Sequence, residues 1–303
     1  PDGGFLLGGH SDSRITGDKT QDNRDLNALR TDFWIVKITS TGTKVWDATY
    51  GSNSHDKLMH IVKSRTGGYL LLGDSYSDPG FEKTASLKGV NDYWAVKINE
   101  AGVKQWDASY GGNDLEVFNT ATQTADGGYI IGGGSRSGIG ADKSQSCRGF
   151  DDSWLVKVDS MGAIQWERTF GNDGSDYCNA IIQNADGSYI FSTNSGSNAG
   201  NEKSQAKMGW YDFWVVKLDS LGNKIWDGIY GSDDSEYLSS MTQSHDYGLV
   251  LAGHSAGNIS ADKSQNSRGY ADYWVIKLLN NEISLGLAND TFCIGAAVDL
   301  QYD

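Results

Sequence analysis

The chain repeats five times a loop segment in which an acidic residue is followed by lysine and then by serine or threonine. A carboxylate, an ammonium and a hydroxyl at equivalent positions could form a ring of ligand contacts. They could equally hold the loops, because Asp and Ser side chains hydrogen-bond to nearby backbone groups. We favour this structural role, since long loops need internal hydrogen bonds. The acids are Asp18, Glu82, Asp142, Glu202 and Asp262.

Aromatic residues follow three of these acids at equivalent positions. They are Phe150, Trp210 and Tyr270, whereas the first two copies have Arg30 and Val90 there. If they are exposed, such flat and rigid rings could stack on sugar rings. They could also tuck under the loop. The sequence leaves both arrangements open.

A second set of loops is rich in oxygen ligands. Residues 172–176 read NDGSD and residues 232–236 read SDDSE, which suggests Ca²⁺, an ion that several oxygens enclose. The twelve-residue calcium loop of EF-hands is absent. We therefore predict no metal or other cofactor, with Ca²⁺ as the alternative. These loops end in Asp56, Glu116, Asp176 and Glu236.

Signals for catalysis are weak throughout the chain. None of the five histidines has metal-ligand or triad spacing, and G-x-S-x-G, H-E-x-x-H and P-loop motifs are absent. Enzymes built on repeats break the repeat symmetry where a few unique polar residues converge. The departures from symmetry here are mild, so we predict that the chain is not an enzyme.

The cysteines allow one disulfide. Cys147 and Cys178 belong to loops that we expect on the same face, and a bond between them would indicate an oxidising compartment. Cys293 would then pair beyond residue 303 or stay a thiol. No C-x-x-C metal spacing occurs.

Charge and hydropathy exclude two classes of partner. The formal net charge of −14 argues against nucleic acid, whose phosphates need a basic surface. No run of eighteen apolar residues is present, so no segment is expected to span a membrane. An acidic surface of this kind is typical of a soluble secreted protein.

These side chains are carried by an internal repeat of about 60 residues. The segments DFWIVKI, DYWAVKI, DSWLVKV, DFWVVKL and DYWVIKL recur, as do KVWDATYG, KQWDASYG, IQWERTFG and KIWDGIYG. The upstream segments GGFLLGG, GGYLLLG, GGYIIGG, GSYIFST and YGLVLAG also align. The tryptophans that mark the period are Trp34, Trp94, Trp154, Trp214 and Trp274.

Each copy predicts four short antiparallel strands, which we name A to D from inside to outside. In the copy from residue 176, Asp186-Gly187 supplies the turn between strands A and B, and residues 219–222 supply the turn between C and D. The chain then starts in strand B, with five B and C strands but only four clear A and D strands. A degenerate candidate for the fifth D strand lies at residues 283–285. Four-stranded repeats around an axis are typical of a β-propeller.

Strand direction decides which loops share a face. The B–C and D–A loops emerge on one face, and the tight A–B and C–D turns emerge on the other. Long, variable loops are where recognition usually lies, so we expect any ligand on the first face.

A lysine follows each repeated tryptophan inside strand C. A lysine in a sheet that is covered on both faces must be paired or reach water. We expect a structural ion pair with the aspartate that begins the same strand (Asp32 and its equivalents) or with the D–A acids. The lysines are Lys37, Lys97, Lys157, Lys217 and Lys277.

The repeat resembles a known family. Residues 271–278 (ADYWVIKL), 222–226 (GNKIW) and 230–234 (YGSDD) are similar to the bacterial seven-bladed β-propeller repeat, DxFVxKLDxxGxxxWxxxxGGxxxD, and the likeness covers residues 2–280. The DGGY and DKSQ segments also resemble propellers of large proteins exported by type IX secretion. The resemblance implies a secreted or surface-attached protein and no single activity.

We expect a β-propeller over residues 1–287, with repeats at about 2–65, 66–125, 126–185, 186–245 and 246–287. Residues 288–303 resemble a linker and the start of an immunoglobulin-like β-sandwich, so further domains are expected on both sides. The expected function is a non-catalytic, extracellular recognition or adhesion module that binds glycan or protein. The alternatives are a structural spacer of a surface assembly and, less favoured, a polysaccharide-active enzyme.

Overall fold

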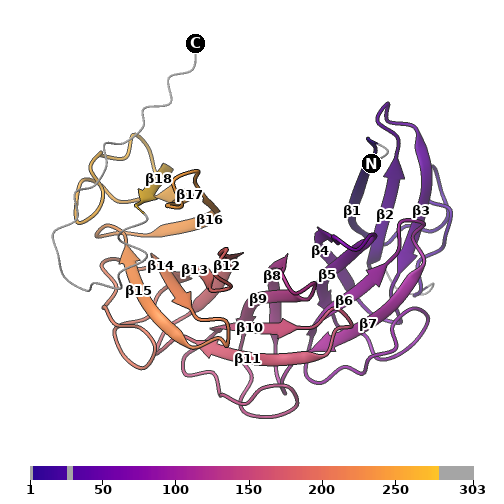
Figure 1. Cartoon of the computed structure of the whole chain (residues 1–303), viewed down its shortest axis with the longest axis horizontal. Coiled ribbons are helices and arrows are strands. Elements are labelled where there is room, and N and C mark those ends of the chain that lie inside the picture. Colours follow the sequence, from indigo (N-terminus) through magenta and orange to yellow (C-terminus); the bar gives the residue numbers. More distant parts are fainter. Residues whose placement is uncertain (1–2, 26–29, 280–303) are drawn as a thin grey trace. The chain divides into compact units, whose positions relative to one another are not determined.

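A computed structural model describes residues 3–25 and 30–279, and these residues fold as strands and loops without a helix. Figure 1 shows them as a succession of small sheets. No segment of the described ranges is a helix that could cross a membrane. The fold is therefore all-β, as the repeat predicts.

Eighteen strands are present in the described residues, and they form five antiparallel sheets in chain order. The first sheet has three strands, the next three sheets have four strands each, and the last has three. The strands are β1 (Phe5–Ser11), β2 (Asp32–Ile38), β3 (Lys44–Tyr50), β4 (Asp56–Lys63), β5 (Tyr69–Ser75), β6 (Asp92–Ile98), β7 (Lys104–Tyr110), β8 (Glu116–Gln123), β9 (Tyr129–Ser135), β10 (Asp152–Val158), β11 (Ile164–Phe170), β12 (Asp176–Gln183), β13 (Tyr189–Ser195), β14 (Asp212–Leu218), β15 (Lys224–Tyr230), β16 (Glu236–Gln243), β17 (Leu249–Ser255) and β18 (Asp272–Leu278).

The predicted order of strands is confirmed. Within the described residues the first sheet contains strands B, C and D (β1–β3), and the last contains A, B and C (β16–β18). Each complete sheet begins at strand A, as at Asp56 or Asp176, about ten residues before the repeat boundaries expected from sequence. The expected fifth D strand and the immunoglobulin-like segment lie outside the described residues.

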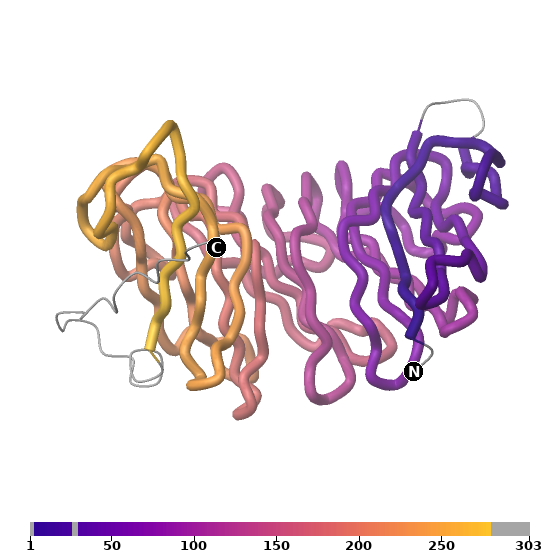
Figure 2. Tube along the Cα trace, turned by 90° about the horizontal axis from the view of Figure 1, so that it is seen from above, coloured from indigo at the N-terminus to yellow at the C-terminus, as the bar shows by residue number. Residues whose placement is uncertain are grey.

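The turns explain why the strands stop where they do. Gly162 and Gly222, in the C–D turns, have positive φ of 86° and 81°, a conformation that glycine adopts without steric cost. Asp159 Oδ1 accepts the N–H of Met161 at 2.8 Å and of Ala163 at 2.9 Å. Gly187, in an A–B turn, has φ of 85°. Figure 2 shows turns and loops gathered at the two ends of the strands.

The described residues divide into two compact units, which we treat separately. The first comprises residues within Pro1–Ser146 and Leu155–Arg168, and the second those within Cys147–Trp154 and Thr169–Asp303. In both, strand A of one sheet packs against the preceding sheet: β4 against β1 and β2, and β16 against β12, β13 and β14. Sheets of one unit therefore stack face to face.

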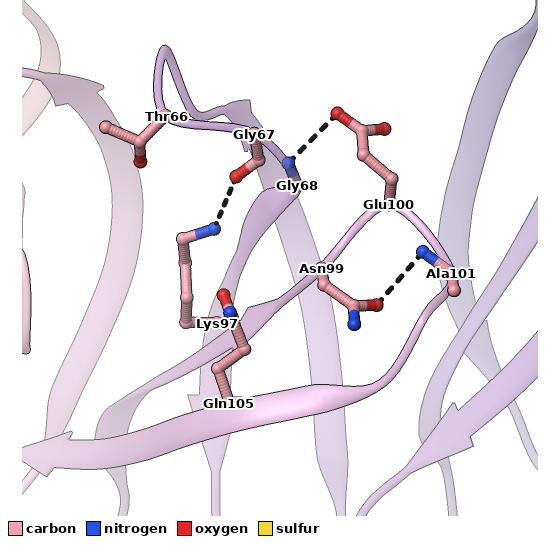
Figure 3. A pocket seen from close by; sticks show the side chains of 8 residues that line it. All are labelled: Thr66, Gly67, Gly68, Lys97, Asn99, Glu100, Ala101 and Gln105. Atoms are coloured by element: carbon pink, nitrogen blue, oxygen red, sulfur yellow. Dashed lines mark hydrogen bonds between the residues drawn. The ribbon is translucent and has the colours of Figure 1, made fainter.

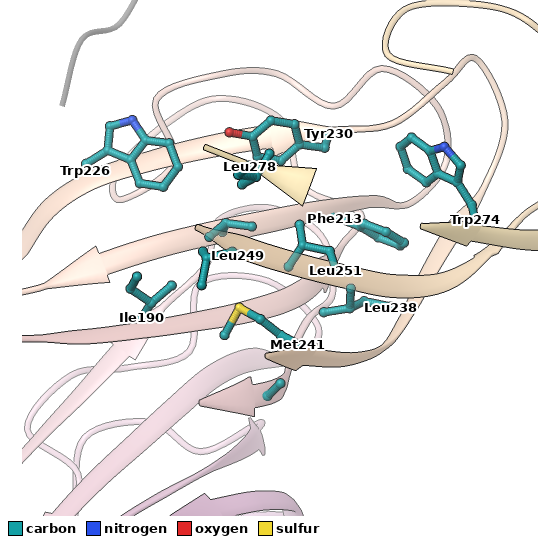
Figure 4. Packing of buried hydrophobic residues seen from close by; sticks show 12 residues of the cluster. Ile190, Phe213, Trp226, Tyr230, Leu238, Met241, Leu249, Leu251, Trp274 and Leu278 are labelled. Carbon is teal, nitrogen blue, oxygen red and sulfur yellow. The ribbon is translucent and has the colours of Figure 1, made fainter. Parts of the chain in front are cut away.

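The core lies between stacked sheets. Figure 4 shows the layer in the second unit where Phe213 and Trp274 approach Leu238, Leu249 and Leu251. The rings of Phe213 and Trp274 are 5.1 Å apart. An equivalent layer in the first unit is formed by residues of the first and second sheets.

A β-bulge in strand A joins neighbouring sheets. The register shifts between Phe118 and Thr120 in β8, and between Leu238 and Ser240 in β16. The backbone N–H of Phe118 donates to Asp74 Oδ1 at 2.7 Å, and that of Leu238 donates to Asn194 at 2.6 Å. Both acceptors lie on strand B of the preceding sheet, so bulges place N–H groups between sheets instead of leaving them unpaired.

Candidate binding face

The B–C and D–A loops meet at one end of the sheets. The backbone N–H of Phe150 donates to the carbonyl of Gly174 at 3.0 Å, and that of Trp210 donates to Asp234 at 3.0 Å. The same bond joins Val90 to a D–A loop in the first unit at 2.8 Å. The end of each of these B–C loops is thus held by the D–A loop that leads into the next strand A.

The repeated aromatic residues point into solvent rather than under the loop. Phe150, Trp210 and Tyr270 are 74%, 71% and 95% exposed, and all three belong to the second unit. We call them the aromatic row. Lys207 lies 5.7 Å above the Trp210 ring, a cation–π contact that leaves most of the ring open. The sequence left open whether these rings are exposed or lie under the loop, and in the structure they are exposed.

Local backbone geometry fixes the loops that carry Phe150 and Trp210. A Cβ atom on Gly209 would lie 1.6 Å from the carbonyl oxygen of Asp234, and one on Gly149 would lie 2.1 Å from that of Gly174. Only glycine lets these two loops approach so closely. The rings of Phe150 and Trp210 therefore follow glycines at which the B–C and D–A loops are in close contact.

Apolar side chains from the B–C loops add to this end of the sheets. Ile139 in the first unit and Ile259 in the second are exposed at equivalent positions. These residues were not predicted, although isoleucine recurs before three of the five lysine motifs, in SRIT, SGIG and GNIS. Exposed apolar residues of this kind are frequent in binding surfaces.

The acids of the lysine motif join sheets and do not form a free ring. Arg24 pairs with Glu82 at 2.6 Å, and Lys88 pairs with Asp142. In the second unit the Arg148 guanidinium lies 3.5 Å from Glu202. These cations occupy one repeat position, just before strand C, and we call the pairs inter-sheet ion pairs.

Two of the five acids, Asp262 and Asp18, form no inter-sheet ion pair in the described residues. The cation position that would face Asp262 is occupied by Met208, and the Asp262 carboxylate accepts the N–H of Gly231 at 3.0 Å. Burial raises the pKa of Asp262. Asp18 belongs to the first sheet, and its backbone carbonyl accepts a hydrogen bond from Lys44. This cation position was not predicted, although the copies align there as Arg24, Lys88, Arg148, Met208 and Arg268.

The lysine of each motif is buried, and Lys83 and Lys203 each donate to several polar groups. Lys83 Nζ donates to the carbonyl of Ala85 at 3.0 Å and to Ser109. Lys203 donates to Ser195 Oγ at 2.7 Å and to the carbonyl of Ser197 at 2.6 Å. Burial lowers the pKa of both ammonium groups, while nearby carboxylates oppose that shift.

Two buried carboxylates flank each of these lysines. For Lys83 they are Asp56, which begins strand A, and Asp92, which begins strand C. Asp56 Oδ2 accepts the N–H of Ser52 at 2.8 Å and the hydroxyl of Ser77 at 3.0 Å. Burial raises the pKa of each carboxyl to about 6. The D–A acids are therefore part of a structural network with the motif lysine.

The D–A loops proposed for Ca²⁺ use many of their oxygens internally. Asp173 accepts the backbone N–H of Asn198 at 2.9 Å and its side-chain amide at 3.1 Å. Asp176 accepts the hydroxyl of Ser197. Within residues 3–25 and 30–279, no three His, Cys, Asp or Glu side chains gather in a way that could hold a metal ion. Calcium binding stays the alternative to the prediction of no cofactor.

The repeated tryptophans anchor strand C to strand D. The indole N–H of Trp94 donates to Asp107 at 3.1 Å, and that of Trp214 donates to Asp227 at 3.0 Å. The same carboxylates accept the backbone N–H of the motif hydroxyl residues, at 2.8 Å from both Thr84 and Ser204. Strand D thereby fixes the B–C loop as well. Trp94, Trp154 and Trp214 are fully buried, Trp274 is nearly so, and Trp34 is half-buried.

Two of the strand C lysines form the expected structural ion pairs, but with acids other than the strand C aspartates or the D–A acids. Lys157 pairs with Asp126 at 2.8 Å and Lys277 with Asp246 at 2.5 Å, and both acids lie in A–B turns. Lys97 instead donates to the carbonyl of Gly67, in the corresponding turn, at 2.8 Å. The antiparallel register places the A–B turn beside the lysine end of strand C. The aspartate that begins the strand lies at the opposite end.

A shallow pocket of about 430 Å³ lies at the turn end of the first unit (Figure 3). Glu100 accepts the N–H of Gly68 at 3.0 Å, and Asn99 accepts that of Ala101 at 2.9 Å. The hydrogen bond from Gly68 holds the pKa of Glu100 below its usual range. Glu100, Asn99 and Lys97 use polar atoms within the lining itself, and we assign this pocket no ligand.

The predicted disulfide is not formed among the described residues. Cys178 is fully buried in β12, and burial raises its thiol pKa. Cys147 lies in a B–C loop, where its sulfur is 3.5 Å from the carbonyl of Gly149. Neither sulfur belongs to a disulfide in the part of the chain that the structure describes. Cys293 lies outside the described residues.

Comparison with known proteins supports the fold and no more. No protein-family model and no curated protein sequence matches the chain. Hydrazine synthase of Kuenenia stuttgartiensis is similar in structure, with a TM-score of 0.50 and 7% identity over 82% of this chain. The tail fiber of Staphylococcus aureus phage P68 matches with a TM-score of 0.30 and 11% identity over 86% of this chain.

The chain spans 59% of the hydrazine synthase chain and 47% of the tail fiber chain. At 7% identity the first likeness concerns the fold alone. Together with the succession of antiparallel sheets, it indicates a repeated, propeller-like β-sheet fold.

Proposed function

We propose that the chain is a non-catalytic recognition module that binds glycan through the end of the sheets that carries the B–C and D–A loops. The observation that supports this most is the aromatic row, three exposed rings at one repeat position. Aromatic faces stack on the C–H faces of sugars, and rigid rings lose little entropy on binding. Protein binding by the same face is an outcome of the test below.

The same proposal includes the closed arrangement of the sheets and the location of the protein. We propose that the sheets are blades of a β-propeller in a large secreted or surface-attached bacterial protein. The type IX export route follows from the resemblance of the DGGY and DKSQ segments alone. The net charge of −14 suits an extracellular module that must stay soluble.

The test is a glycan-array screen of the recombinant chain, with and without Ca²⁺, beside Trp210→Ala. Tyr247→Ala is the matched control, since Tyr247 is an exposed ring in the A–B turn of the last sheet, away from the loops. We expect selective binding that Trp210→Ala loses and Tyr247→Ala keeps. Equal binding by both variants, or binding of proteins alone, would overturn the glycan proposal. A loss restricted to calcium-free buffer would support the D–A loops as ion sites.

A second candidate is a structural spacer with no small ligand. One observation favours it: the first and last sheets each expose an apolar face, with Leu7 on one and Val275 on the other. A spacer should expose large contact patches on its sides, whereas a glycan binder should not need them. Absence of glycan binding under both calcium conditions would favour this function.

A further inference from the structure

The first sheet exposes a face that the next sheet buries. Antiparallel pairing places Leu7 opposite Val36 and Phe5 opposite Ile38, so these side chains share one face with Trp34. Leu7 is 53% exposed, whereas Leu71, its equivalent in the second sheet, is completely buried. A cavity of about 550 Å³ is lined by residues of this face. We call it the receiving face: Phe5, Leu7, Trp34, Val36 and Ile38.

The second sheet shows what such a face is built to contact. There the equivalent residues, among them Leu71 and Trp94, pack against Phe33 and Ile35 of the first sheet. The rings of Phe33 and Trp94 are 4.8 Å apart. The occupant of a receiving face is thus the outer face of a preceding sheet, with an aromatic residue at the second position of its strand C.

The last sheet exposes an outer face of this kind. Tyr273, at the second position of β18, is 96% exposed, and Val275 is half exposed. Their equivalents in the fourth sheet, Phe213 and Val215, are completely buried in the core of the second unit. We call Tyr273, Val275 and Val250 the donating face.

Charge follows the same pattern as the apolar residues. Each inter-sheet ion pair joins a cation of one sheet to an acid of the next, as Arg24 joins Glu82. Arg268 occupies the cation position of the last sheet, and Asp18 occupies the acid position of the first. In the described residues neither side chain has an ion-pair partner. The two ends of the series are complementary in charge.

We propose that the donating face of one molecule binds the receiving face of a second copy, head to tail. The Tyr273 ring would pack on the Trp34 indole as Phe33 packs on Trp94, and Arg268 would pair with Asp18 as Arg24 pairs with Glu82. This contact uses none of the residues of the aromatic row. The test of this contact is therefore independent of the test of glycan binding.

A contact between two different faces has no built-in limit of two copies. Each added molecule presents a new donating face, so the assembly either closes into a ring or continues as a filament. We expect the mass of the chain in solution to rise with concentration.

The first test measures that mass by size-exclusion chromatography with light scattering, over a range of concentrations. Leu7→Arg and Tyr273→Arg should each abolish the rise, because each places a cation in an apolar contact. Both positions are exposed, so the variants should keep the circular dichroism spectrum of the parent chain. Tyr247→Arg, at an exposed ring of the last sheet outside either face, is the matched control and should behave as the parent.

Charge reversal tests the orientation. Asp18→Lys and Arg268→Glu should each self-associate more weakly, because each brings like charges together. An equal mixture of the two variants should regain association, since the introduced lysine of one molecule meets the introduced glutamate of another. Rescue by mixing requires two different chains in one contact.

Three outcomes would overturn the proposal. The first is a parent chain that stays monomeric at every concentration. The second is a failure of mixing to rescue the charge-reversal variants. The third is cysteine crosslinking in Asp18→Cys/Arg268→Cys that joins the two positions only within one chain.

Discussion

The ammonium of Lys83 lies 5.6 Å from the centre of the Trp94 indole, and both side chains are buried. The lysine comes from a B–C loop and the tryptophan from strand C. The same relationship recurs at 6.0 Å between Lys203 and Trp214. In these two sheets the lysine of a motif that could have bound a ligand is instead part of the buried core. The exposed aromatic row is left as the candidate for binding.

Lys83→Met should destabilise the chain by about 3 kcal/mol at pH 8, because it leaves Asp56 and Asp92 buried without their shared cation. At pH 5 the loss should be smaller, since both carboxyls have pKa values of about 6 and become neutral. Urea unfolding at the two pH values measures the difference. Lys63→Met, at an exposed lysine of β4, should change stability by no more than about 0.5 kcal/mol.

Stability should fall as pH rises from 5 to 8. Burial raises the pKa of Asp32 to about 7 and of Asp92 and Asp212 to about 6, above the unfolded value near 4. Such groups stabilise the fold fully below their unfolded pKa, and this contribution is lost as pH rises through 6 to 7. Each carboxyl should contribute on the order of 2 kcal/mol.

Asp92→Asn tests this pH dependence directly. An amide cannot ionise, so the variant should lose less stability than the parent chain between pH 5 and 8. Asp78→Asn, at an exposed loop carboxyl, should follow the parent curve. Parallel curves for all three proteins would show that Asp92 does not titrate in this range.

The loss of stability that we expect at low pH has a different origin. Burial opposes ionisation of Asp47, but hydrogen bonds from Lys44 and Thr20 outweigh it and lower its pKa to about 2. Asp47 therefore stabilises the fold above pH 4, and this contribution is lost as pH falls through 2. The two kinds of carboxyl together place the stability maximum at mildly acidic pH.

The fold could be predicted well from the sequence because each copy repeats the same pattern of strands and turns. Strand C is fixed by its tryptophan, and Gly222 supplies the positive φ that the C–D turn needs. The partner of Lys157 could not be found in the same way. Asp152 is near in sequence, but a strand rises about 3.3 Å per residue, which puts it far along the same strand. Asp126 is distant in sequence and adjacent across the sheet.

Contacts between copies were the hardest to predict. Arg24 and Glu82 belong to different sheets, and nothing in either copy indicates which acid the arginine meets. The exposure of Trp210 was also undecided, since it depends on how closely Gly209 approaches the D–A loop. Both depend on the packing of one sheet on another, which an alignment of single repeats does not contain.

Met208→Arg should restore the missing inter-sheet ion pair with Asp262. Arg148 makes the equivalent contact to Glu202 at 3.5 Å. For such a partly exposed pair we expect a gain of about 0.5 kcal/mol, reduced at high salt. Thermal unfolding at low and high ionic strength measures it. Met208→Gln, which lacks the charge, should show no salt-dependent gain, and an equal effect of both variants would contradict the ion-pair explanation.

Gly209→Ala should both destabilise the chain and weaken binding through Trp210. Its Cβ would lie 1.6 Å from the Asp234 carbonyl oxygen, so the B–C and D–A loops must separate, at a cost of about 1–3 kcal/mol. Gly269 holds the same repeat position in the last sheet, but nothing lies within 4 Å of a Cβ there. Gly269→Ala should therefore be close to neutral in dilute solution, where copies do not associate. If both variants unfold at the parent's denaturant midpoint, close approach of the two loops does not hold Trp210, and its ring would need another support.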